Sequence, residues 1–264
     1  MTRKNDLETT VSPLPIVILL HGGKGGAGKS QLGHVLVHKA LVAGKKVILF
    51  DADYDNADMW AAWHRELKNN EERYRIHTRN EGAWDFVTET IMSLDDSYVV
   101  VINLPAGVGD INEDILKNMM IATGARFVTL WALDPGIQPM NTLVRYLSQS
   151  AGEPVVIAKS SFKVDNDTDF EALHTFRDQI DLRGGYTFEV PRSPLRARLW
   201  MTEGETSPTT LEDLRRGGEP LSLTAVIQRR SLPGQRMKIW VNTVGQHVWN
   251  AVDLAAVTSE ITSN

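Results

Sequence analysis

The sequence of 264 residues contains no cysteine, so it can form no disulfide, thiolate metal site or cysteine-ligated iron–sulfur cluster. It also lacks an apolar run long enough to cross a bilayer. Its first residues, from Met1 to Asp6, are polar and contain no apolar signal core. Together these absences predict a cytoplasmic protein that does not enter a membrane.

Neither sign of charge dominates the chain, which carries 28 basic and 33 acidic residues and a formal net charge of −5. This balance argues against a protein dedicated to binding polyanions, although it allows a local basic patch. Hydrophobic residues make up 42% of the chain, enough to bury a large core in one α/β domain.

Continuous apolar runs alternate along the chain with stretches of helical periodicity. The runs predict strands at 16–20, 47–50, 98–102, 127–131, 154–158 and 186–190. The stretches between them predict helices at 30–43, 56–69, 81–92, 111–122, 137–150 and 167–181. Strands that are apolar throughout favour a mostly parallel sheet with helices on both faces. We therefore expect a doubly wound α/β fold, whose ligands bind at the carboxyl ends of the strands.

A phosphate-binding pattern, G-x-x-x-x-G-K-[ST], lies between the first predicted strand and the first predicted helix. Its eight residues are Gly23, Lys24, Gly25, Gly26, Ala27, Gly28, Lys29 and Ser30. The glycines allow the backbone to wrap a phosphate chain, and the Lys29 ammonium adds a full positive charge. The Ser30 hydroxyl is the expected Mg²⁺ ligand. The loop therefore predicts binding of a nucleotide with Mg²⁺.

Lys24 places a second lysine inside the loop, and with it the loop resembles that of the ParA/MinD family of deviant Walker-A P-loop ATPases. The resemblance implies that Lys24 acts in catalysis by reaching the phosphates bound to a partner copy. An ATP-dependent homodimer is therefore expected. On this reading, residues 1–13 are a disordered arm and 14–264 a single P-loop ATPase domain. Its tail from about residue 205 is predicted to form helices that pack on the same domain.

Acidic residues follow the second predicted strand, in the segment from Asp51 to Asn56. The segment resembles the family's Asp-x-Asp-x-x-x-Asn pattern. By that match Asp53 would position the attacking water, and Asp51 would have a role linked to Mg²⁺. The alternative is a polar turn that only caps the next helix.

The segment from Tyr98 to Gly107 resembles the family's third motif but departs from it at one position. Asn103 stands where the family usually has the Walker-B aspartate, and an amide contributes no charge beside Mg²⁺. The Gly107 N–H would remain available to a γ-phosphate. The resemblance therefore implies ATP binding with slow hydrolysis. Further along, Pro191 follows the last predicted strand in a segment that resembles the one near the adenine in ParA proteins.

The expected cargo and partners come from the resemblance. ParA-type dimers bind DNA non-specifically through late basic residues, and the candidates here are Arg192, Arg196, Arg198, Arg215, Arg216, Arg229 and Arg230. A switch that positions or segregates plasmid DNA, in partition or conjugative transfer with an unidentified activating partner protein, is the first hypothesis. The alternative is a nucleotide-binding scaffold or regulator of a bacterial surface apparatus, such as a flagellum, a pilus or a polysaccharide exporter, with little or no turnover. The last residues lack the basic amphipathic helix that membrane anchoring requires.

Overall fold

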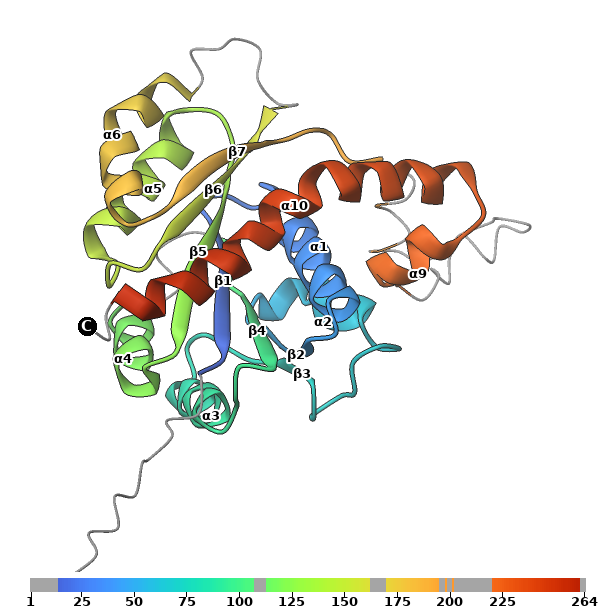
Figure 1. Ribbon diagram of the computed structural model, residues 1–264, viewed down its shortest axis with the longest axis horizontal. Coiled ribbons are helices and arrows are strands. Elements are labelled where there is room, and N and C mark those ends of the chain that lie inside the picture. The colour runs from blue at the N-terminus through green and yellow to red at the C-terminus, as the bar shows by residue number, and fades with distance from the viewer. Residues whose placement is uncertain are drawn as a thin grey trace, which may run out of the picture.

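The computed structural model describes residues 14–106, 113–161, 170–194, 198, 201 and 220–261. Seven parallel strands form one sheet in the order β3-β2-β4-β1-β5-β6-β7. The strands are β1 (Ile16–Gly22), β2 (Lys46–Asp51), β3 (Arg73–Arg75), β4 (Tyr98–Asn103), β5 (Arg126–Leu133), β6 (Val155–Ser160) and β7 (Tyr186–Val190). This sheet confirms the predicted doubly wound α/β fold and places β1 at its centre (Figure 1).

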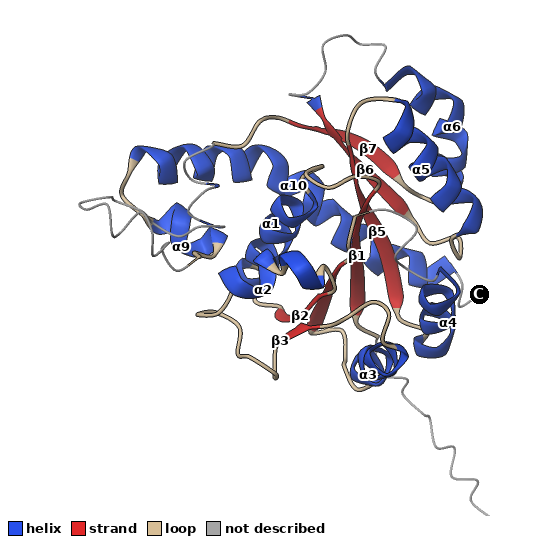
Figure 2. Ribbon diagram, turned by 180° about the vertical axis from the view of Figure 1, so that it is seen from behind, coloured by secondary structure: helices blue, strands red, loops and turns tan. Residues whose placement is uncertain are grey.

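Helices cover both faces of the sheet, as the apolar strands predict. The helices α1 (Lys29–Val42), α2 (Asp58–Ala62), α9 (Leu223–Gln228) and α10 (Leu232–Ile261) share a hydrophobic core with one face. The helices α3 (Glu81–Met92), α4 (Glu113–Thr123), α5 (Ile137–Gln149) and α6 (Glu171–Leu182) cover the other (Figure 2). Along β1, Ile18 belongs to the first core and its neighbour Leu19 to the second. A strand buried on both faces in this way requires continuous apolar residues.

The C-terminal helix α10 packs on the same domain as the loop, crossing over α1 (Figure 1). The two helices approach closely at Gly245, where an added Cβ would lie 2.4 Å from Cε of Lys39. Helix α10 also contacts β1, β5 and β7 directly, so α1 and α10 pack on the same face of the sheet and against each other. In the described ranges, none of the helices combines the length and apolar content needed to cross a membrane.

The helix predicted at 56–69 is the main error in the sequence-based secondary structure. A single 3-10 turn, η1 (Tyr54–Asn56), and the short helix α2 occupy its first part, and turns then lead to the edge strand β3. The guanidinium of Arg73 donates hydrogen bonds to the carbonyl oxygens of Trp60 and Leu67, at 2.6 and 2.9 Å. These bonds hold the turns after α2 against the edge strand. Strand β3 was missed because its three residues are polar or aromatic and give no apolar run.

Candidate nucleotide-binding site

The glycine-rich loop connects the carboxyl end of the central strand β1 to the first turn of α1. Gly28 has a φ of 100°, in the left-handed region that glycine adopts without a steric penalty. Gly23 is required for a different reason, because an added Cβ would lie 2.8 Å from Cβ of Thr142 on α5. One glycine thus permits the turn, and the other permits close packing against α5.

The loop leaves space and hydrogen-bond donors for an anion. A Cβ added at Gly25 or Gly28 would meet no atom of the described residues within 4 Å. Helix α1, 14 residues long, starts at Lys29, and its N-cap residue, Gly28, has no side chain that could cap it. The N–H groups of its first turn have no acceptor within the helix, and the positive end of the helix dipole lies there. A phosphate chain fits this arrangement.

Lys29 lies beside three carboxyl groups and is only 6% exposed. Burial lowers the pKa of Lys29, whereas the negative charges of Asp53, Asp58 and Asp51 raise it. Burial also raises the pKa of Asp53, and the charge of Lys29 lowers it. Three acidic side chains thus surround one ammonium, and a further cation bound there would favour their charged forms.

Asp51 and Asn103 form a buried pair at the ends of the neighbouring strands β2 and β4. The side-chain amide of Asn103 donates a hydrogen bond to Oδ1 of Asp51 at 2.8 Å, and the backbone N–H of Trp60 donates to Oδ2 at 2.9 Å. Both side chains of the pair are fully buried. Burial raises the pKa of Asp51 to about 7, although these two hydrogen bonds lower it. Oδ1 of Asn103 is buried without a hydrogen-bond partner among the described residues.

Asp58, the first residue of α2, is a site residue that the sequence reasoning missed. Burial raises the pKa of Asp58, and a hydrogen bond from the side chain of Ser30 lowers it. Its position, five residues after Asp53, matches no family pattern, so the available sequence signal was only another carboxyl group in an acidic segment.

The side chains at the loop have the chemistry that Mg²⁺ prefers. The Ser30 hydroxyl, Oδ1 of Asn103 and Oδ1 of Asp58 are hard oxygen donors, and the last two have no hydrogen-bond partner among the described residues. Within the described ranges, no three His, Asp or Glu side chains gather closely enough to hold a metal ion by themselves. Mg²⁺ commonly takes several of its ligands from phosphates and water.

The base of the loop is fixed by His21, which the sequence reasoning also missed. His21 is fully buried, and its ring stacks on that of Trp131 with the centroids 4.5 Å apart. Its Nδ1 accepts a hydrogen bond from the backbone N–H of Gly22 at 2.8 Å. Burial lowers the pKa of His21 to about 3, so the ring is neutral at physiological pH. His21 therefore positions the start of the loop without adding charge.

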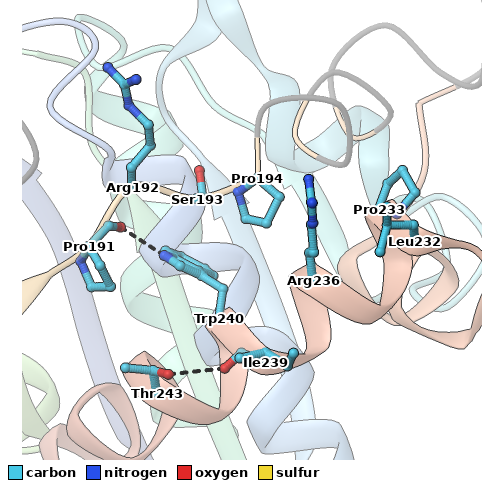
Figure 3. Close-up of a pocket in the computed structure, with 10 residues that line it drawn as sticks. All are labelled: Pro191, Arg192, Ser193, Pro194, Leu232, Pro233, Arg236, Ile239, Trp240 and Thr243. Atoms are coloured by element: carbon cyan, nitrogen blue, oxygen red, sulfur yellow. Dashed lines mark hydrogen bonds between the residues drawn. The ribbon is translucent and has the colours of Figure 1, made fainter.

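Pro191 directly follows β7, near a hollow of about 730 Å³ (Figure 3). The Pro191 carbonyl oxygen accepts a hydrogen bond from Nε1 of Trp240 on α10 at 2.8 Å. Two residues later, the Ser193 hydroxyl donates to the Gln31 side chain at 2.8 Å, which links this segment to the first turn of α1. The hollow is lined by Pro191, Arg192, Ser193, Pro194, Leu232, Pro233, Arg236, Ile239, Trp240 and Thr243.

The remaining residues that the sequence predicted for the site or for DNA binding are spread over several segments, and some lie outside the described residues. Lys24 is exposed on the loop, as a residue that contacts another molecule must be. Arg192 follows β7, and Arg229 and Arg230 follow α9. Arg198 lines a small cavity beside the loop. Gly107, Arg196, Arg215, Arg216 and the arm at 1–13 lie outside the described residues.

Comparisons with known proteins give relatives at low sequence identity. No family model matches the chain. The chain is 27% identical to Protein MobD of Acidithiobacillus ferrooxidans over 180 residues, which span 66% of this chain and 77% of that protein.

Two solved structures are similar over much of their length. The MinD cell division protein of Aquifex aeolicus aligns over 87% of this chain and 96% of its own, at 14% identity and a TM-score of 0.44. A plasmid partition protein of Borrelia burgdorferi aligns over 67% of this chain and 90% of its own, at 15% identity and a TM-score of 0.42. MobD, MinD and this partition protein are the kinds of protein to which the chain is similar.

Proposed function

We propose that the chain is an ATPase of the ParA/MinD type that binds ATP with Mg²⁺ and acts as a nucleotide-dependent switch with slow hydrolysis. The observation that carries the proposal is the loop at 23–30, where buried Lys29 and the uncapped start of α1 meet at the end of the central strand. Such a site favours a phosphate chain. ATP is proposed over other nucleotides because the loop, with its second lysine, resembles that of this ATPase family.

The side chains at the loop suggest a division of roles. Ser30 would hold Mg²⁺, and Asp51 would be linked to the ion through Asn103. Bound Mg²⁺ would neutralise charge on the terminal phosphates. Asp53, half-buried beside Lys29, would position the attacking water, and the N–H of Gly107 would contact the γ-phosphate. Hydrolysis would be slow because the neutral amide of Asn103 occupies the Walker-B position.

Dimerisation should depend on both ATP and Lys24. We expect sedimentation to show a dimer with Mg²⁺–ATP and a monomer with ADP, and Lys24→Ala to remain monomeric with ATP. The reason is that an exposed lysine on the loop can reach the phosphates held by a second copy, which makes a two-fold interface depend on nucleotide. Lys46→Ala is the matched control, because Lys46 is exposed at the opposite end of the sheet. A monomer under every condition would contradict the dimer model.

DNA is the proposed cargo, by resemblance to ParA-type proteins with late arginines. We expect random duplex DNA to bind in the presence of ATP and to dissociate as salt is raised, because contacts to phosphates release counterions. Fluorescence anisotropy with ATP and with ADP, over a salt series, measures this. If no binding occurs at low salt with either nucleotide, DNA is not a direct ligand. The alternative, a regulator of a bacterial surface apparatus that acts through a protein partner, would then be favoured.

A further inference from the structure

We propose that Asp58 supplies the negative charge beside Mg²⁺ that Asn103 cannot provide. In this role Asp58 orients the Ser30 hydroxyl toward the ion and accepts a hydrogen bond from a Mg²⁺-bound water. The inference rests on the proposed function, since it assigns a positioning residue to the same nucleotide site.

At the ends of β2 and β4, Asn103 is paired with Asp51 and brings no charge of its own. The amide nitrogen of Asn103 is engaged by Asp51, which leaves its Oδ1 turned away from Asp51, buried and unpartnered among the described residues. An amide oxygen can accept a hydrogen bond from a metal-bound water but carries no net charge. Asp51 itself is fully buried, with both oxygens accepting hydrogen bonds. Neither Asp51 oxygen is therefore left without a hydrogen bond.

Ser30, the expected Mg²⁺ ligand, has Asp58 as a side-chain partner. The Ser30 side chain donates its hydrogen bond to the Asp58 carboxylate. A serine whose proton is donated in this way keeps its oxygen lone pairs available for a cation. The other carboxylate oxygen of Asp58, Oδ1, is buried without a partner among the described residues. Asp58 can therefore act on the ion both through Ser30 and through a bound water.

Asp58 is held in place by the contacts of the two residues that follow it in α2. Residue Met59 packs so closely on α1 that a Cβ added at Gly33 would lie 2.5 Å from its sulfur atom. The N–H of Trp60 is bonded to Asp51. Helix α2 is thus fixed from two sides, and Asp58 at its start faces a defined part of the site. Such fixed placement is what a residue that orients a metal ligand requires.

The proposal predicts opposite effects on ATP binding with and without Mg²⁺. With the ion bound, the Asp58 carboxylate is attracted to it. Without the ion, the same carboxylate repels the phosphates. Calorimetry in Mg²⁺ and in EDTA gives two dissociation constants, and their ratio defines the Mg²⁺ effect. For Asp58→Asn we expect this effect to fall at least about tenfold, with affinity in EDTA unchanged or higher.

The controls separate this role from a structural one. Asp55→Asn changes an exposed carboxylate in η1, three positions before Asp58, and should keep the Mg²⁺ effect of the wild type. Loss of folding would raise both dissociation constants by the same factor, and it would be visible in thermal melts. If Asp58→Asn does not fold, Asp58→Ser removes the same charge and should give the same fall.

Two results would overturn the proposal, and they can be told apart. A Mg²⁺ effect in Asp58→Asn equal to that of the wild type would exclude a role of Asp58 toward the ion, while leaving the nucleotide site intact. Absence of ATP binding by the wild-type protein, with or without Mg²⁺, would overturn both this inference and the proposed function.

Discussion

Replacing Lys29 with alanine is expected to remove measurable ATP binding, with a loss of affinity of about 100-fold or more. The Lys29 ammonium is buried at the loop, where its interaction with a phosphate is screened little by water. Loss of charge-assisted hydrogen bonds to phosphate should cost about 3 kcal/mol. Calorimetry with Mg²⁺–ATP on the wild type and on Lys29→Ala measures the difference.

A second variant shows whether the loss of ATP affinity comes from removing the positive charge of Lys29. Lys29→Met keeps most of the aliphatic side chain, so it should preserve the packing while losing affinity to the same extent. Removing the ammonium also leaves the nearby carboxylates without their positive neighbour, and both variants should therefore be compared with the wild type by thermal melting. Equal ATP affinity in wild type and Lys29→Ala would refute the assignment of the phosphate site.

Asn103→Asp is expected to destabilise the nucleotide-free protein by about 3 kcal/mol, because two carboxylates would meet in a buried pair. The amide nitrogen of Asn103 now lies 2.8 Å from Oδ1 of Asp51. An aspartate there either repels Asp51 or must take up a proton. Urea denaturation without nucleotide measures the loss, and bound Mg²⁺–ATP should offset part of it.

Exchanging Asp51 and Asn103 for each other gives a more specific test of this pair. The double variant Asp51→Asn/Asn103→Asp again contains one carboxylate and one amide, so its stability should be well above that of Asn103→Asp. It also places the charge at the Walker-B position, and we expect faster phosphate release than in the wild type. If Asn103→Asp alone is as stable as the wild type, the two side chains do not form the close pair described here.

The sequence allowed the fold and the loop to be predicted because their signals are local. The central strand is a continuous apolar run, and the loop is a fixed spacing of glycines and lysines directly after it. The contacts that complete the site join distant segments. The hydrogen bond of Ser30 to Asp58 depends on the placement of α2, and the stacking of His21 on Trp131 depends on the pairing of β1 with β5. Neither distance along the chain nor residue type indicates these pairs.

The edge of the sheet shows a second limit of prediction from the sequence. A helix over 56–69 was expected from periodicity, whereas the chain turns after Ala62 and returns as a three-residue strand. The interactions that hold this turn come from Arg73, which lies beyond the predicted helix. Tertiary hydrogen bonds thus override the local preference, and no pattern within 56–69 reveals them.

The burial of α1 narrows the surface on which an activating partner could act. This helix packs against the sheet, α9 and α10, and its one fully exposed residue is Val42, at the end far from the loop. A partner that influences the nucleotide therefore cannot dock along α1. Surface mutagenesis or crosslinking aimed at finding the partner can concentrate on the outer side of α10, on η1 and α2, and on the helices of the opposite layer.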